Sequence, residues 1–77
     1  MTANRTIDAR GSFCPGPLME LIATMKMMQV GETVELLSTD KGSADDVPEW
    51  VKKVGHEMVS TDQTADGVWR IQVRKKK

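Results

Sequence analysis

The run Cys14-Pro15-Gly16-Pro17 constrains the fold of this chain more than any other part of the sequence. Proline cannot donate a backbone hydrogen bond and glycine weakens regular structure, so such a run does not lie inside a helix or a central strand. Proline is well tolerated in the first turn of a helix, where the N–H groups lack a partner within the helix. The run therefore predicts a helix over residues 15–28, with Cys14 at or next to its N-cap.

The residues after this run predict which face of the helix is buried. Gly31 favours the left-handed backbone at which many helices end. Met27 falls roughly opposite the predicted core. Met19 lies on the flank near Cys14, where it either forms an apolar rim for partner contact together with Phe13 or belongs to a loosely packed core. The core-facing stripe, with its i, i+3, i+4, i+7 spacing, consists of Leu18, Leu21, Ile22, Met25 and Met28.

Four segments are predicted to be strands because apolar and polar residues alternate along them. Asp66-Gly67, between the last two segments, is a strong hairpin signal. In the second segment Val34 and Leu36 face one side and Leu37 faces the other. The segments are Arg5–Ala9, Thr33–Ser38, Glu57–Thr64 and Val68–Arg74.

A second amphipathic helix is predicted after a loop over residues 39–42. Ser43 and Asp46 have the spacing of a capping box, and Gly55 stands where a helix ends. Pro48 implies either that the regular helix begins near Asp46 or that the segment is kinked. The apolar stripe of this helix consists of Val47, Trp50, Val51 and Val54.

The order of these elements is β-α-β-α-β-β. It predicts an α/β (α+β) two-layer sandwich, with two helices on one face of a four-stranded mixed sheet. The length of 77 residues predicts a single domain over residues 1–77. With one cysteine the chain cannot form an internal disulfide, so the fold must be stabilised by packing.

The composition excludes several classes of function. The formal net charge is zero, which argues against a protein that wraps a nucleic-acid backbone. One cysteine and one histidine cannot supply a four-ligand zinc site, and no metal or cofactor is expected. The polar start of the chain has no apolar stretch typical of a signal peptide, and no segment is long and apolar enough to span a membrane. We therefore expect a soluble, cytoplasmic protein in which the thiol stays free.

Cys14 is the candidate nucleophile. Unpaired N–H groups and the positive end of the helix dipole favour the thiolate or a persulfide anion at this position. Pro15 and Pro17 stiffen the backbone around the sulfur, and Gly16 leaves room for an approaching partner. Arg10 would add local positive charge if its loop folds back. The alternative is a buried, inert cysteine, but this run lowers helix propensity without an evident packing gain.

No second cysteine is present to resolve a bond to Cys14, which excludes dithiol chemistry. His56 follows Gly55 at the start of a predicted strand, and we interpret it as solvated or capping rather than as a base for Cys14. Without a base, a cysteine hydrolase is disfavoured. These features favour a carrier that accepts a group covalently and yields it to another protein.

The stretch from Asp8 to Leu18 resembles the Asp-x-x-Gly-x-x-Cys-Pro-x-Pro motif of the TusA/SirA family of sulfur carriers, and the resemblance extends over nearly the whole chain. It implies a two-layer sandwich in which Cys14 holds sulfane sulfur as a persulfide, with Pro15 and Pro17 as positioning residues. It also implies a cysteine desulfurase or rhodanese-like donor and a DsrE-like protein or thiolation enzyme as acceptor. In the family this relay serves tRNA thiolation, cofactor synthesis or sulfur oxidation.

Two departures from the family pattern lie where partners would dock. Ser12-Phe13 precedes the motif cysteine, and Lys41-Gly42 follows Asp40, which matches an acidic loop position of the family only approximately. The candidate partner contacts are therefore Arg10, Phe13, Met19 and Asp40.

Two other functions stay open at this point. One is a regulatory or redox-sensing binding module of the same fold. The other is an RNA-binding domain that uses the basic tail over residues 74–77, although this tail is predicted to be solvated and disordered. Trp50 and Trp69 lie on apolar stripes and are predicted to be core residues, so direct nucleic-acid binding is disfavoured.

Overall fold

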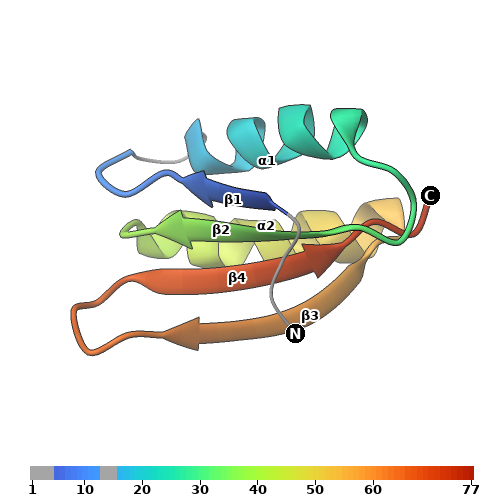
Figure 1. The fold of residues 1–77 in the computed structure, drawn as a ribbon. Coiled ribbons are helices and arrows are strands. Elements are labelled where there is room, and N and C mark those ends of the chain that lie inside the picture. Colours follow the sequence, from blue (N-terminus) through green and yellow to red (C-terminus); the bar gives the residue numbers. More distant parts are fainter. Residues whose placement is uncertain (1–4, 13–15) are drawn as a thin grey trace.

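The computed structural model describes residues 5–12 and 16–77. The chain runs through a strand, a helix, a strand, a helix and two final strands, as Figure 1 shows. The elements are β1 (Arg5–Asp8), α1 (Gly16–Met27), β2 (Thr33–Ser38), α2 (Lys41–Val54), β3 (Glu57–Gln63) and β4 (Trp69–Arg74).

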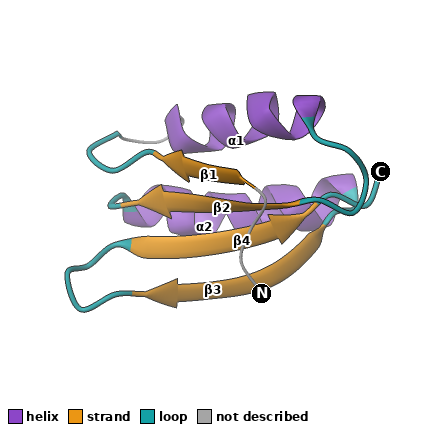
Figure 2. Ribbon diagram, viewed as in Figure 1, coloured by secondary structure: helices purple, strands orange, loops and turns teal. Residues whose placement is uncertain are grey.

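The strands form one mixed sheet in the order β1-β2-β4-β3. β1 and β2 are parallel neighbours joined through α1, while β4 lies antiparallel between β2 and β3. The helices and the sheet form two layers (Figure 2). The predicted β-α-β-α-β-β sandwich is therefore confirmed.

The core lies between the helices and the inner face of the sheet. The predicted stripe of α1 is buried at Leu21 and Met25, while its flanking members Leu18 and Ile22 are half-buried. In β2 the alternation is strict, since Val34 and Leu36 are buried and the residues between them are half-buried. The inner face of β4 buries two more apolar side chains, and both tryptophans pack against the core as predicted: Ile71, Val73, Trp50 and Trp69.

The outer face of the sheet is polar. Arg70 on β4 forms ion pairs with Glu35 on β2 (3.3 Å) and with Asp62 on β3 (3.9 Å). Glu35 also accepts a hydrogen bond from the Gln72 amide at 3.3 Å. These cross-strand pairs give the uncovered face a solvent-compatible surface.

The helix α2 begins earlier than the sequence analysis predicts. Residues 41 and 42 belong to the helix rather than to a loop, and Asp40 is the N-cap. The Asp40 carboxylate accepts hydrogen bonds from the Ser43 backbone N–H (3.2 Å) and from the Ser43 hydroxyl (3.0 Å). This cap and the buried side chain of Ser43 stabilise the first turn of α2. Pro48 lies inside the helix.

The basic tail is partly anchored, which corrects the prediction that it is solvated and disordered. The Lys75 ammonium donates hydrogen bonds to the carbonyl oxygens of Met25 and Met28, both at 2.7 Å. The Lys75 backbone N–H donates to the Glu32 carbonyl, and the Lys75 carbonyl accepts from the Gly31 N–H. Lys75 thus caps the C-terminal end of α1, where a positive charge is favourable.

His56 is held in its neutral form by its surroundings. Its Nδ1 accepts the backbone N–H of Lys76 at 3.1 Å, as a capping role would require. Partial burial, followed by the positive charges of Lys75 and Lys77, lowers the His56 pKa from its ordinary value of 6.5. Because the unfolded chain binds this proton more readily, the contribution of His56 to stability is complete above pH 6.5 and is lost as the pH falls through the folded pKa.

We therefore expect the ring of His56, the only histidine, to titrate with a midpoint below 6.5 in the folded protein. Nuclear magnetic resonance of the ring protons measures this directly. Urea unfolding at pH 7.5 and 5.5 should show lower stability at the acidic pH, and H56N should reduce that difference. A folded midpoint at or above 6.5 would contradict the structure.

Candidate functional site

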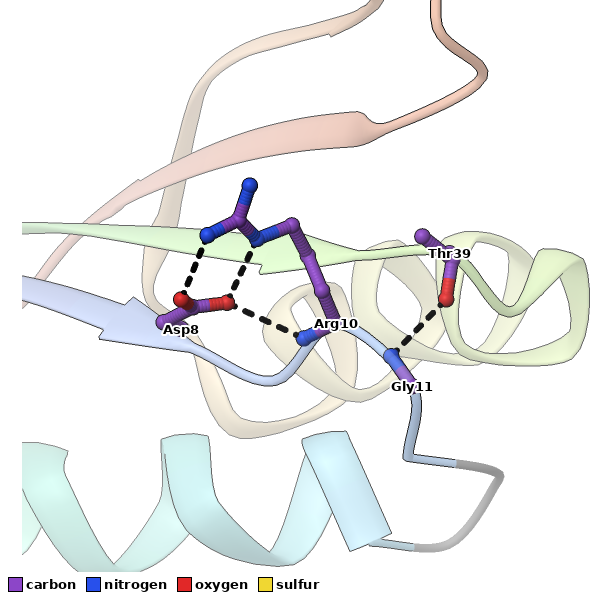
Figure 3. Close-up of polar contacts among 4 residues, drawn as sticks. All are labelled: Asp8, Arg10, Gly11 and Thr39. Carbon is purple, nitrogen blue, oxygen red and sulfur yellow. Dashed lines mark hydrogen bonds and ion pairs between the residues drawn. The ribbon is translucent and has the colours of Figure 1, made fainter.

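Polar contacts among Asp8, Arg10, Gly11 and Thr39 hold the chain where it leaves β1 toward the cysteine motif (Figure 3). We call these four residues the clamp. The Arg10 guanidinium donates two hydrogen bonds of 2.8 Å to the Asp8 carboxylate, and the Arg10 backbone N–H donates a third at 3.2 Å. The side-chain hydrogen bonds, followed by the backbone bond, lower the Asp8 pKa to about 2, and the same pair raises the Arg10 pKa. Asp8 therefore stays ionised, and Arg10 stays paired, at any physiological pH.

Gly11 continues the clamp with a backbone conformation that other residues adopt at a cost. Its φ angle is +86°, and no atom would crowd a side chain there, so the requirement for glycine comes from the backbone alone. The Gly11 N–H donates to the Thr39 hydroxyl at 3.0 Å, which ties the loop to the end of β2. The Ser12 N–H donates to the Ala9 carbonyl, and the Ala9 N–H to the Leu37 carbonyl.

α1 begins at Gly16, two residues after Cys14 in the sequence. A Cβ atom added to Gly16 would lie 3.7 Å from the Ser12 Cβ. The residue that follows the clamp therefore lies close to the first turn of α1. Pro17 is buried. The first turn of α1 contains no acidic side chain that would oppose an anion at the helix N-terminus. Phe13, Cys14 and Pro15 lie outside the described residues.

The structure assigns local contacts to several predicted site residues. Arg10 lies in the loop before Cys14, but Asp8 compensates its charge, so it adds little net positive potential there. Asp40 caps α2 and follows Thr39. Met19 is 59 % exposed, so the loose-core alternative is wrong and the side chain is available for contact. His56 lines a cavity with Met25 and Lys26, near the far end of α1 from Gly16.

Sequence reasoning missed two residues of the clamp. The sequence analysis names Asp8 only as the first residue of the family motif and predicts no contact for it, although an aspartate two residues before an arginine can form a local ion pair. The contact of Thr39 could not be predicted from the local sequence, because its hydrogen bond with Gly11 joins residues 28 positions apart. Together these residues restrain the end of β1 and the loop over residues 9–12 that follows it.

None of the described helices is long and apolar enough to cross a membrane. Within residues 5–12 and 16–77, no group of three or more histidine, aspartate or glutamate side chains could hold a metal ion.

Comparison with known proteins places the chain in a family. The sequence profile described as "Sulfurtransferase TusA" matches residues 5–75. A protein of Archaeoglobus fulgidus, provisionally named a sulfur carrier protein, is 61 % identical over 92 % of this chain and 96 % of its own length. The sulfur carrier protein TusA of Pseudomonas syringae is 32 % identical over 99 % of this chain and 89 % of its own length.

A solved structure supports the fold. The SirA-like protein of Desulfitobacterium hafniense superposes with a TM-score of 0.85, covering 95 % of this chain and 99 % of that one, at 20 % identity. That likeness shows the arrangement of helices and strands alone. Because the family profile covers almost the entire sequence, this chain belongs to the TusA family of sulfur carriers.

Proposed function

We propose that this protein carries sulfane sulfur as a persulfide on Cys14 and transfers it to an acceptor protein. The observation that carries the proposal is the run Cys14-Pro15-Gly16-Pro17, whose last two residues are the first two of α1, in a chain of the TusA family. The clamp supports it, because it restrains the chain that leads into the run.

The start of α1 supports the proposal electrostatically. The first N–H groups of a helix have no partner within the helix, and together with the helix dipole they favour an anion. Gly16 and Leu18 carry such groups, whereas Pro17 has none. With no carboxylate in this turn, a thiolate or persulfide next to it is not repelled. The same field lowers the pKa of a cysteine at this position and increases its reactive fraction.

The transfer we propose has two balanced steps. The Cys14 thiolate attacks the outer sulfur of a donor persulfide, the S–S bond of the donor breaks, and the donor leaves as a thiolate. A thiolate of the acceptor then attacks the outer sulfur on Cys14 and restores the Cys14 thiolate. No net oxidation occurs in either step. We propose a cysteine desulfurase or a rhodanese-like protein as donor, and a DsrE-like protein or a thiolation enzyme as acceptor.

The test is the intact mass of the reduced protein after incubation with a cysteine desulfurase and cysteine, and separately with a rhodanese and thiosulfate. We expect the wild type to gain one sulfur atom with at least one donor, and a reductant to reverse the gain. Cys14→Ser should gain none while remaining folded, as circular dichroism would show. Failure with both donors, although the thiol reacts with an alkylating probe, would overturn the proposal in favour of a regulatory module.

A further inference from the structure

A cavity of about 250 Å³ opens between the C-terminal parts of α1 and α2. Both helices end on the side of the molecule where the C-terminus lies, at the far end of α1 from Gly16 (Figure 1). The volume is smaller than that of a typical small-molecule site and suits one large apolar side chain. The apolar part of the lining consists of Ile22, Met25, Trp50 and Val54.

Basic side chains surround this apolar lining. Lys26 from the last turn of α1 and Lys75 and Lys77 from the tail line the cavity, together with the ring of His56. The Lys77 side chain lies across the end of α2, since a Cβ atom added to Gly55 would be 2.9 Å from the Lys77 Nζ. The charges of Lys75 and Lys77 reach the cavity, because they contribute to the lowered pKa of His56.

The positive charge of this rim is not balanced by nearby carboxylates. In the described part of the chain, neither Lys26 nor Lys77 forms an ion pair. Glu57 pairs instead with basic residues of β4 and the tail, and Glu32 accepts a backbone N–H just beyond α1. Lys75 is engaged with the last carbonyl groups of α1. The ammonium groups of Lys26 and Lys77 therefore remain available to an anion.

An apolar hollow with ammonium groups at its rim suits an acidic peptide that carries one apolar anchor. The anchor fills the hollow while flanking carboxylates reach the ammonium groups. A nucleic acid would require an exposed aromatic face for its bases, whereas Trp50 is half-buried and packs against the core. A membrane surface is bound by apolar side chains that protrude, whereas these line a cavity.

The other side of Trp50 has the opposite charge. A second cavity shares Trp50 with the first, and its charged lining residues are Asp46, Glu49 and Lys53. Two carboxylates and one ammonium group make this second cavity negative, so it repels an acidic segment. The charges along the two helices therefore confine such a segment to the C-terminal ends of α1 and α2.

We infer that the cavity between the ends of α1 and α2 binds an acidic segment of a partner protein, with one large apolar side chain against Trp50 and carboxylates on Lys26 and Lys77. Lys26 lies about 15 Å from Gly16 along α1, at a rise of 1.5 Å per residue. A segment bound there leaves the start of α1 open. If Cys14 carries sulfur as proposed, a partner held at the cavity stays tethered during the transfer. The binding itself does not depend on the sulfur chemistry.

The test is a titration with a peptide that has one phenylalanine between two runs of four glutamates and is blocked at both ends. At low ionic strength we expect a dissociation constant on the order of 0.1 mM, and weaker binding in about 0.5 M salt. Amide chemical shifts in nuclear magnetic resonance should change mainly at residues 22–26, 50–56 and 75–77. Replacing the phenylalanine by alanine should weaken binding about tenfold, because the apolar anchor is lost.

Charge-reversal variants locate the site. K26E and K77E should each weaken binding of the phenylalanine peptide by roughly fivefold. The matched control is K41E, which changes the net charge equally but lies at the opposite end of α2, where Lys41 pairs with Asp45. It should alter the affinity by less than about twofold. V54E places a carboxylate on the apolar wall of the cavity and should abolish detectable binding.

Several results would overturn the inference. One is no binding of the phenylalanine peptide up to millimolar concentration. Equal losses in K26E and K41E would mean that net charge rather than the cavity attracts the peptide. Equal affinity for the alanine and phenylalanine peptides would mean that the hollow is unused. Tighter binding of an oligouridine RNA of the same charge, also weakened by K26E, would assign the surface to nucleic acid instead.

Discussion

Leu36→Ala is expected to lower the free energy of unfolding by about 3 kcal/mol, which is a large share of the stability of a domain this small. Leu36 is fully buried on β2, and its register partners are Ile7 on β1 and Ile71 on β4. Truncation removes apolar contacts under both helices and leaves a cavity that neighbouring strands cannot fill. For a chain of this length we expect the midpoint of thermal unfolding to fall by roughly 15 °C.

The adjacent residue provides the matched control. Leu37 is on the same strand but faces the uncovered side of the sheet, next to Asp8 and Arg70 in register, and is half-buried. Leu37→Ala should cost about 1 kcal/mol or less. Urea unfolding of both variants measures the difference. Equal losses would mean that the two faces of the sheet are equally covered, which would contradict the two-layer arrangement.

Gly11→Ala is expected to slow sulfur loading of Cys14 on the order of tenfold, with a modest loss of stability of about 1 kcal/mol. The added methyl group meets no neighbour, so the whole cost arises from the φ angle of +86°. Relaxing that strain shifts the segment between the Asp8–Arg10 pair and Cys14. If Cys14 carries the sulfur as proposed, a small displacement of its sulfur atom lowers the rate of sulfur loading more than it lowers the free energy of unfolding.

Gly31→Ala is the control for this prediction. Gly31 also has a positive φ, +97°, and open space around it, but it lies beyond the far end of α1. Both variants should lose similar stability in urea, while only Gly11→Ala slows the gain of sulfur measured by intact mass over time. Equal rates in the two variants would show that the clamp does not position Cys14.

Much of the fold could be predicted from local sequence patterns. The stripe of α1 and the alternation in β2 gave the correct buried faces because periodicity directly reports which side chains meet the core. The Asp66-Gly67 hairpin is confirmed as well, with the Gly67 N–H donating to the Thr64 carbonyl. These features depend on residues close together in the chain.

The sequence predictions failed where two local patterns disagreed, and they missed contacts between residues far apart in the sequence. At α2, Pro48 suggested a late start, but the bond from Ser43 to Asp40 fixes the start at Lys41. Asp40-x-x-Ser43 is itself a capping pattern, so this information was present in the sequence. The hydrogen bond from Gly11 to Thr39 was not predictable from either residue alone.

The hydrogen bonds of Lys75 also bear on the order in which this protein acquires its structure during synthesis. Two carbonyl groups at the end of α1, those of Met25 and Met28, receive their donor from a residue about fifty positions later. Until residue 75 has left the ribosome, the Met25 carbonyl keeps only the hydrogen bond from the Met28 N–H, and water takes the place of the Lys75 ammonium at both carbonyls. The C-terminal end of α1 therefore has its full set of hydrogen-bond donors only once the segment that follows β4 has been synthesised.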